Sequence, residues 1–218
     1  MDENLIVELE KDGVVTATFR KLPPTKKTAV YRAALSAFAS ASSDRTALDG
    51  IAHTAGVSKG SLFQYFTHKD NLLAFVTELF FDEYQQFWES YLAREQAVRV
   101  HDRMLDYVRT LEEYWTANPV EAEFCLNMLF ENGGELSAGF RAHLVDLHRG
   151  HVTDIVARGI NTGEIRRDLS RQALVDVLLA VLLSLNHTIM TAPARGKKAR
   201  GFADREAVLR VLFSGMAG

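Results

Sequence analysis

Side chains of the kinds that bind DNA gather in one short stretch of this chain, between residues 58 and 69. They are Ser58, Lys59, Gly60, Ser61, Gln64, Tyr65, His68 and Lys69. Lys and Gln side chains hydrogen-bond to base edges in the major groove, and hydroxyl and ammonium groups bind phosphates. A glycine near a helix start also lets the backbone approach a sugar-phosphate strand. The chemistry that this set predicts is recognition of double-stranded DNA.

Two short helices joined by a tight turn must position these side chains. Apolar residues between Leu48 and Ala55 recur at helical spacing and predict the first helix. Thr46, a further candidate for DNA contact, is expected to cap this helix, with Asp49 completing a capping box. Gly56 stands where a helix ends in the left-handed conformation, and Ser58 can cap a second helix two residues later. This pattern predicts a helix-turn-helix.

The second helix of the motif is expected from Lys59 to Phe66. Leu62 and the last residue of this helix would dock inward, one turn apart. That arrangement leaves Ser61, Gln64 and the first residue of the helix outside, where they can read a major groove. A packed helical hairpin without DNA binding could have the same polar set.

One more helix completes a three-helix head, and a long helix follows the head. Small and apolar residues predict a helix at 25–41 that packs on the motif. Lys26 and Lys27, at its start, are placed to contact the DNA backbone. Another helix begins after His68, where its N-terminal N–H groups and Lys69 can meet a phosphate.

The segment LDGIAHTAGVSKGSLFQYFTHKDNLL resembles the DNA-binding signature of the TetR (tetracycline-repressor-like) family of bacterial transcription regulators. The strong resemblance extends from Val30 to Phe75, and GINTGEIRRDL, at 159–169, matches a turn common in the C-terminal domain of that family. Ala47 and Phe63 depart from the family pattern, so two hydroxyl contacts to phosphate are missing. The resemblance implies an all-α fold and a homodimer that binds a palindromic operator.

Charge is distributed unevenly along the chain. The segment 20–69 has eight Lys or Arg and two Asp, a net +6, although the whole chain has a formal net charge of −3. A basic module on an acidic remainder is what a DNA-binding head requires, because phosphate contacts supply much of the affinity. We expect an N-terminal extension at 1–24, a helix-turn-helix domain at 25–72, and a ligand-binding and dimerisation domain at 73–218.

The extension at 1–24 is expected to be a short β-hairpin. The segments LIVELE and VVTATF are rich in β-branched residues, and the Asp12-Gly13 pair between them is a strong hairpin signal. Pro23-Pro24 would then form a stiff link to the head. The hairpin is either an accessory arm for dimerisation or DNA contact, or an ordered decoration.

Residues 73–218 are expected to form a helical body, which a long helix at 70–96 joins to the head. Further helices are expected at 101–117, 119–131, 137–159, 170–191 and 203–217. Aromatic residues are more numerous here than a core of this size needs, as in helical ligand pockets. The candidates for binding a small hydrophobic or aromatic effector are Trp88, Tyr91, Tyr107, Trp115, Phe124 and Phe130. Each of them could instead be a core residue.

The helices at 170–191 and 203–217 are too apolar to be covered within one chain. The uninterrupted apolar run from Val177 to Leu183 is far too short to span a bilayer, so we expect no membrane contact. A two-fold four-helix interface would cover these helices, as the family resemblance also implies. The candidate dimerisation residues are Leu174, Leu178, Leu182, Leu185, Val208 and Leu212.

Other patterns favour neither a cofactor nor a catalytic or metal site. The glycines at 133–139 lack the Lys-Ser/Thr tail of a phosphate-binding loop. His148 and His151 could ligate a metal, but no Cys or carboxylate stands at metal-site spacing, so a structural role is favoured. Cys125 is the single cysteine, which rules out an internal disulfide, and it is expected to be a small buried hydrophobe. No signal segment precedes a cleavage-like site, so we expect a cytoplasmic protein.

The sequence therefore predicts an all-α transcription repressor, and not an enzyme, that binds a palindromic DNA operator as a homodimer. A small molecule bound in the body would change the spacing of the two heads and release the DNA. Two other hypotheses stay open: a helical ligand-binding or protein-interaction module without DNA binding, and an all-α enzyme with a site inside the body. A salt-dependent gel shift tests the first of these, and a turnover assay tests the second.

Overall fold

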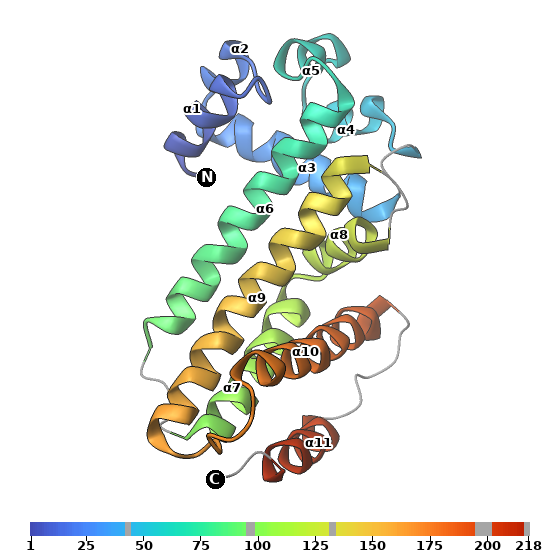
Figure 1. Ribbon diagram of the computed structural model, residues 1–218. Coiled ribbons are helices and arrows are strands. Elements are labelled where there is room, and N and C mark those ends of the chain that lie inside the picture. The colour runs from blue at the N-terminus through green and yellow to red at the C-terminus, as the bar shows by residue number, and fades with distance from the viewer. Residues whose placement is uncertain (42–44, 95–98, 131–133, 195–201, 216–218) are drawn as a thin grey trace. The chain divides into compact units, whose positions relative to one another are not determined.

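The computed structural model describes residues 1–218 except 42–44, 95–98, 131–133, 195–201 and 216–218. Within the described residues every regular element is an α-helix (Figure 1), which confirms the all-α class. The chain divides into two compact units. Unit 1 comprises Met1–Ala93 and Glu123–Leu136, and unit 2 comprises Arg94–Ala122 and Ser137–Gly218.

Four helices form the centre of unit 1: α3 (Pro24–Ser40), α4 (Leu48–Thr54), α5 (Lys59–Tyr65) and α6 (Lys69–Leu92). Helix α3 packs against α4 and α6, and α4 packs against α5. Pro24 stands in the first turn of α3, where its missing N–H has no helical partner to lose. The three helices of the head and the long helix that follows them are therefore where the sequence predicted them.

The N-terminal segment is helical, so the predicted β-hairpin is wrong. Helices α1 (Glu3–Lys11) and α2 (Ala17–Arg20) occupy the two stretches that were expected as strands. Ile6 and Leu9 are both buried, and their spacing of three residues is that of a helix face. Phe19, in α2, is fully buried. Burial of these side chains in unit 1 outweighs the β-propensity of the segment.

The ends of α1 explain why the hairpin signal failed. The carboxylate of Asp2 accepts a hydrogen bond from the N–H of Asn4 at 2.8 Å, which caps the start of the helix. Gly13 has a φ of 73°, the left-handed conformation that commonly follows a helix end. The Asp12-Gly13 pair therefore terminates a helix instead of forming a two-residue hairpin turn.

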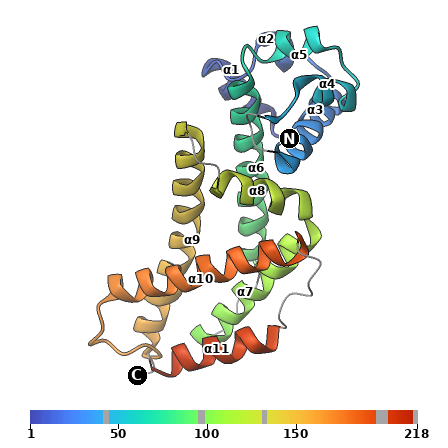
Figure 2. The same cartoon turned by 90° about the vertical axis from the view of Figure 1, so that its right-hand side faces the viewer.

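Unit 2 is built around α7 (Val100–Ala117), which packs against α10 (Arg171–Ala194) and α11 (Phe202–Ser214) (Figure 2). The remaining helices are α8 (Pro119–Phe130) and α9 (Gly134–Thr162), each of which contributes residues to both units. All five helices correspond to helices that the sequence predicted.

Helix α10 is long and apolar enough, over Arg171–Thr191, to cross a membrane by length and composition alone. However, 44% of its apolar window is buried within the protein. Leu178 and Leu182 are each 1% exposed and Leu174 is 8% exposed. The prediction that these leucines face outward for dimerisation is therefore wrong, because they already form the core of unit 2.

The exposed apolar residues on α10 and α11 include one member of the predicted set and two residues outside it. Val177 is 57% exposed, Val208 is 54% exposed and Val211 is 73% exposed. Leu185 and Leu212, two further dimerisation candidates, are half-buried. Of the predicted set, only Val208 is fully on the surface of the chain.

Candidate nucleic-acid interface and effector region

The turn between α4 and α5 has the geometry that the sequence predicted. Gly56 has a φ of 66°, and the N–H of Val57 donates to the carbonyl of Ala52 at 3.0 Å. These features close the end of α4 with a left-handed glycine. Ser58 then caps α5, because its Oγ accepts a hydrogen bond from the N–H of Ser61 at 3.0 Å. The second helix of the motif therefore re-enters sharply after the first.

The start of α4 differs from the prediction. Ala47, and not Thr46, occupies the N-cap position, and no side chain caps the helix there. Thr46 is 6% exposed, and its Oγ1 donates to the carbonyl of Ala41 at 3.4 Å. The predicted capping box is wrong, because Thr46 faces the interior and stabilises the chain ahead of the helix. Thr46 is consequently not available as a surface contact to DNA.

Helix α5 presents a continuous outer face. Its exposed residues are Lys59, Gly60, Phe63 and Gln64. Ser61 is half-buried, and its Oγ lies 2.8 Å from the Oγ of Ser58. Tyr65, which was also expected to contact DNA, is 6% exposed and packs against Phe19 with ring centroids 5.8 Å apart. Tyr65 therefore belongs to the core of unit 1 rather than to its surface.

One ion pair links the two helices of the motif at the surface. The Nζ of Lys59 lies 2.9 Å from Oδ2 of Asp49, and the two side chains are 55% and 69% exposed. A pair this exposed contributes little to stability, since water screens both charges. Lys59 is therefore weakly paired and accessible to an incoming phosphate or base.

The candidates for backbone contact divide into exposed and buried residues. Lys26 and His68 are exposed, and Lys69 is half-buried at the start of α6. Lys27 is only 2% exposed, and its Nζ donates to both carboxylate oxygens of Glu3 at 2.8 and 2.9 Å. The prediction that Lys27 contacts DNA is not met by this geometry, because the ammonium group faces α1.

Phe63 is a further candidate for DNA contact that the sequence analysis did not include. It is 48% exposed and lies one turn after Lys59 on the outer face of α5. Helical spacing alone places the two on one face, so this signal was available in the sequence. An exposed aromatic ring on a reading helix can contact the methyl group of thymine.

The predicted effector residues do not lie in one unit. Trp88, Tyr91 and Phe124 are buried in unit 1, whereas Phe130, in the same unit, is 62% exposed. The other two, Tyr107 and Trp115, are each 1% exposed or less and belong to unit 2.

A buried chain of hydrogen bonds crosses unit 2 between α7, α9 and α10. The indole Nε1 of Trp115 donates to Oδ1 of Asn186 at 2.6 Å. Nδ2 of Asn186 lies 3.4 Å from Nε2 of His148. The hydroxyl of Tyr107 lies 2.5 Å from Nδ1 of His148 and 3.2 Å from Nδ1 of His151. A neutral His148 with its proton on Nδ1 satisfies this order of donors and acceptors.

Burial sets the protonation of these groups. It lowers the pKa of His148 to about 3, with a smaller contribution from the charge of His151. Burial also lowers the pKa of His151, although Asp154 acts in the opposite direction. Cys125 is buried, and burial raises the pKa of its thiol, so it stays protonated. Among the described residues no group of three His, Cys, Asp or Glu could hold a metal ion.

A tight glycine turn, an exposed polar face on the second helix and the net charge of +6 over residues 20–69 together define a helix-turn-helix DNA-binding motif within unit 1. Residues 30–76 match the family model described as bacterial regulatory proteins, tetR family. This match confirms, for residues 30–76, the resemblance to the TetR family that the sequence predicted.

Solved structures with this fold extend the likeness to nearly the whole chain. A TetR family transcriptional regulator from Chloroflexus aurantiacus is 21% identical, with a TM-score of 0.67, covering 94% of this chain and 99% of that one. The transcriptional regulator FadR from Bacillus subtilis, in complex with stearoyl-CoA, is 18% identical, with a TM-score of 0.67, covering 87% and 99%. GusR from Salmonella enterica is 16% identical, with a TM-score of 0.66, covering 89% and 95%. A comparison with curated protein sequences found no match.

Proposed function

We propose that this protein is a ligand-responsive transcription repressor that binds a palindromic DNA operator as a homodimer. The observation that supports this most directly is the outer face of α5, where Lys59, Phe63 and Gln64 are exposed on a capped, seven-residue helix. Helix α5 enters the major groove, and the two copies in the dimer read half-sites about 34 Å apart. The protein is a regulator rather than an enzyme.

Two kinds of contact make up the proposed interface. Gln64 and Lys59 hydrogen-bond to base edges, and Phe63 contacts a thymine methyl group. Phosphates are bound by side chains and backbone around the motif, which fix its register on the duplex. The proposed phosphate contacts are Lys26, Ser58, Gly60, Ser61, His68 and Lys69.

The effector is proposed to be a small hydrophobic or aromatic molecule. Tyr107 and Trp115 of unit 2 combine apolar ring faces with polar edges, a pattern typical of ligand sites in helical proteins. The stearoyl-CoA complex of the similar FadR supports a long apolar ligand as the first candidate. The effector releases the operator because it binds the conformation in which the two heads no longer match the half-sites.

The dimer interface is proposed to form on α10 and α11. Val177 on α10, and Val208 and Val211 on α11, are exposed apolar residues on two helices that both pack against α7. A second copy of the chain covers them with the same surface, as two-fold symmetry requires. Sedimentation of Val208→Glu with Val211→Glu tests this: the double variant is expected to be a monomer, and a stable soluble dimer would place the interface elsewhere.

The DNA proposal is tested by selecting bound sequences from a random duplex library and measuring their affinity by fluorescence anisotropy. Gln64→Ala and Lys59→Ala are each expected to weaken binding to the selected operator by about 1 to 3 kcal/mol. Gln172→Ala, a matched change at an exposed glutamine of α10, is expected to leave the affinity unchanged. If the wild-type chain selects no sequence, the protein is a helical module without DNA binding.

The effector proposal is tested by tryptophan fluorescence. The chain has two tryptophans, so Trp88→Phe leaves Trp115 as the reporter of unit 2. Titration with stearoyl-CoA, with and without operator DNA, measures both affinities. Operator must weaken ligand binding by the factor by which ligand weakens operator binding. Equal ligand affinities in the two titrations would show that ligand binding does not regulate operator binding.

A further inference from the structure

The C-terminal end of the reading helix α5 lacks the usual closure. The last carbonyl groups of any α-helix have no partner within the helix, and a left-handed residue commonly closes the end. Phe66, which follows α5, is instead extended, with φ of −133°. Among the described residues only Gly13, Gly56 and Gly163 have a positive φ, so none closes α5. Something else must satisfy its terminal carbonyls.

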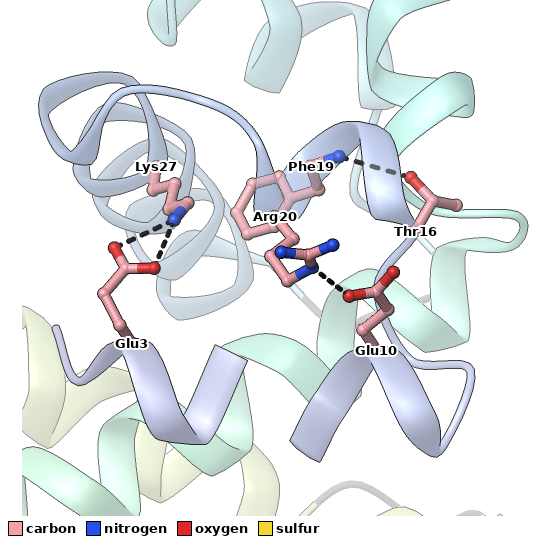
Figure 3. Close-up of polar contacts among 6 residues, drawn as sticks. All are labelled: Glu3, Glu10, Thr16, Phe19, Arg20 and Lys27. Carbon is pink, nitrogen blue, oxygen red and sulfur yellow. Dashed lines mark hydrogen bonds and ion pairs between the residues drawn. The ribbon is translucent and has the colours of Figure 1, made fainter. Parts of the chain in front are cut away.

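A single residue of the N-terminal segment supplies that closure. The Oγ1 of Thr16 donates to the carbonyl of Gln64 at 2.6 Å, and the N–H of Thr16 donates to the carbonyl of Tyr65 at 3.1 Å. Thr16 also caps α2, since its Oγ1 accepts from the N–H of Phe19 at 3.4 Å (Figure 3). The hydroxyl of Thr16 therefore joins α2 to the backbone of the residue that we propose to read bases.

Apolar contacts hold Thr16 in this position. The ring of Phe19 is fully buried, with its centroid 5.8 Å from that of Tyr65, 5.0 Å from that of Phe66 and 4.9 Å from that of Phe75. These rings connect α2 to both α5 and α6. Aromatic pairs at such separations pack favourably and resist displacement.

Polar contacts anchor the segment to α3 and α6 at two further points, and a third contact joins its own two helices. Glu3 binds the buried ammonium group of Lys27, and Glu10 pairs with Arg20 across the turn between α1 and α2 (Figure 3). Nδ2 of Asn71, in α6, donates to the carbonyl of Gly13 at 2.9 Å. The segment is thus fastened to α3, α5 and α6 of unit 1.

We propose that the N-terminal segment 1–22 is a brace for the reading helix, and that Thr16 is a positioning residue for sequence-specific DNA recognition. The proposal rests on the proposed DNA-binding function of α5. A helix of seven residues has little stability of its own, so its orientation depends on its tertiary contacts. Hydrogen bonds to base edges require close placement of the reading side chains, whereas contacts to phosphates tolerate displacement. Loss of the brace therefore reduces specificity more than general DNA affinity.

The test compares Thr16→Val, which removes the hydroxyl and keeps the shape, with Thr16→Ser, which keeps the hydroxyl. Affinities are measured by anisotropy for the selected operator and for a random duplex at one salt concentration. Thr16→Val is expected to weaken operator binding about tenfold while binding to random DNA stays within about twofold, because only base contacts need the exact pose. Thr16→Ser is expected to restore the wild-type ratio. Thr18→Val, at an exposed threonine of α2, is the matched control and is expected to change neither affinity.

The outcomes distinguish a failure of the brace proposal from a failure of the proposed DNA-binding function. A wild-type chain that selects no operator would overturn the proposed function itself. A wild-type chain that selects one, together with Thr16→Val that keeps the full operator-to-random ratio, would overturn the brace alone. Equal losses on both duplexes, or no recovery in Thr16→Ser, would also overturn it. If Thr16→Val does not fold, Asn71→Ala decides: it removes the bond to Gly13, and an unchanged ratio in that variant would overturn the brace.

Discussion

Units 1 and 2 differ in the polar contacts that hold their central helices. In unit 1 the ion pairs reach the surface, as Glu3 is 60% exposed opposite Lys27 and Asp49 is 69% exposed opposite Lys59. In unit 2 the central polar groups are neutral and buried, with His148 at 0% and Asn186 at 1% exposure. Exposed ion pairs are screened by salt and contribute little, whereas buried neutral networks are costly to break. Unit 1 is therefore expected to tolerate polar substitutions that unit 2 does not.

The largest expected effect is the loss of Asn186 in unit 2. Asn186→Ala removes the acceptor for the indole N–H of Trp115 and the neighbour of His148. Because a buried donor then lacks a partner and a cavity remains, the free energy of unfolding should fall by about 2 to 4 kcal/mol. Urea denaturation followed by Trp115 fluorescence in the Trp88→Phe background measures this.

Asn161→Ala provides the control for this change, because Asn161 is exposed near the end of α9. Its free energy of unfolding should stay within about 0.5 kcal/mol of the parent. An equally small effect of Asn186→Ala would show that the buried network does not stabilise unit 2, and the contrast between the units would fail.

The second effect is the response of unit 2 to acid. His148 has a pKa of about 3 in the folded chain against an ordinary value of 6.5, so the unfolded chain binds the proton more readily. The stability contributed by neutral His148 is complete above pH 6.5 and is lost as the pH falls toward 3. The loss approaches about 1.4 kcal/mol per pH unit in that window. Urea titrations between pH 7 and pH 4 measure it.

His148→Gln tests the origin of this acid sensitivity. The amide does not titrate, so the variant should be less stable at pH 7 but should lose less of its stability on acidification. His143→Gln, at an exposed histidine of the same helix, should keep the wild-type pH dependence. An unchanged slope in His148→Gln would assign the acid sensitivity to other groups, such as His151 beside Asp154.

The smallest effect is expected in unit 1. Glu3→Gln weakens the partner of Lys27 but leaves a hydrogen-bond acceptor, and Glu3 is largely in water. The free energy of unfolding should fall by about 1 kcal/mol at low salt and by less at high salt, since salt screens the pair. Glu8→Gln, on the same helix and exposed, is the control and should be neutral. A loss larger than that of Asn186→Ala would reverse the comparison between the units.

Local signals in the sequence were sufficient for the reading motif. Gly56 and Ser58 specify a turn and a cap within a few residues, and both are found in the structure as expected. The hairpin prediction for the N-terminal segment is wrong because its β-branched residues and Asp12-Gly13 favour a hairpin, whereas Asp2 and the spacing of Ile6 and Leu9 favour the helix that forms. Helix capping signals were present at both ends of α1 and competed with the hairpin signal.

Contacts between distant residues could not be predicted from local patterns. Thr16 and Gln64 are 48 positions apart, and Trp115 and Asn186 are 71 positions apart, so nothing in either neighbourhood indicates the bond. The pairing of Lys27 could not be predicted for the same reason. Its charge indicates DNA contact, whereas in the structure its ammonium group binds Glu3 of α1. Burial of Leu178 within the chain could not be predicted from the sequence either, since an apolar helix can pack inside one chain or between two.

The ion pair between Asp49 and Lys59 bears on how DNA binding responds to salt. When the ammonium group of Lys59 leaves Asp49 and enters the groove of the DNA, its charge displaces a condensed cation from the duplex, which contributes about 0.9 to the slope of log affinity against log salt concentration. The Asp49 carboxylate left behind, 69% exposed, then attracts a cation from solution. Release and uptake oppose each other, so Lys59 adds less to the slope than a lysine without such an attached counterion. The number of positively charged side chains that a salt titration of this protein assigns to the DNA interface is therefore smaller than the number that lie there.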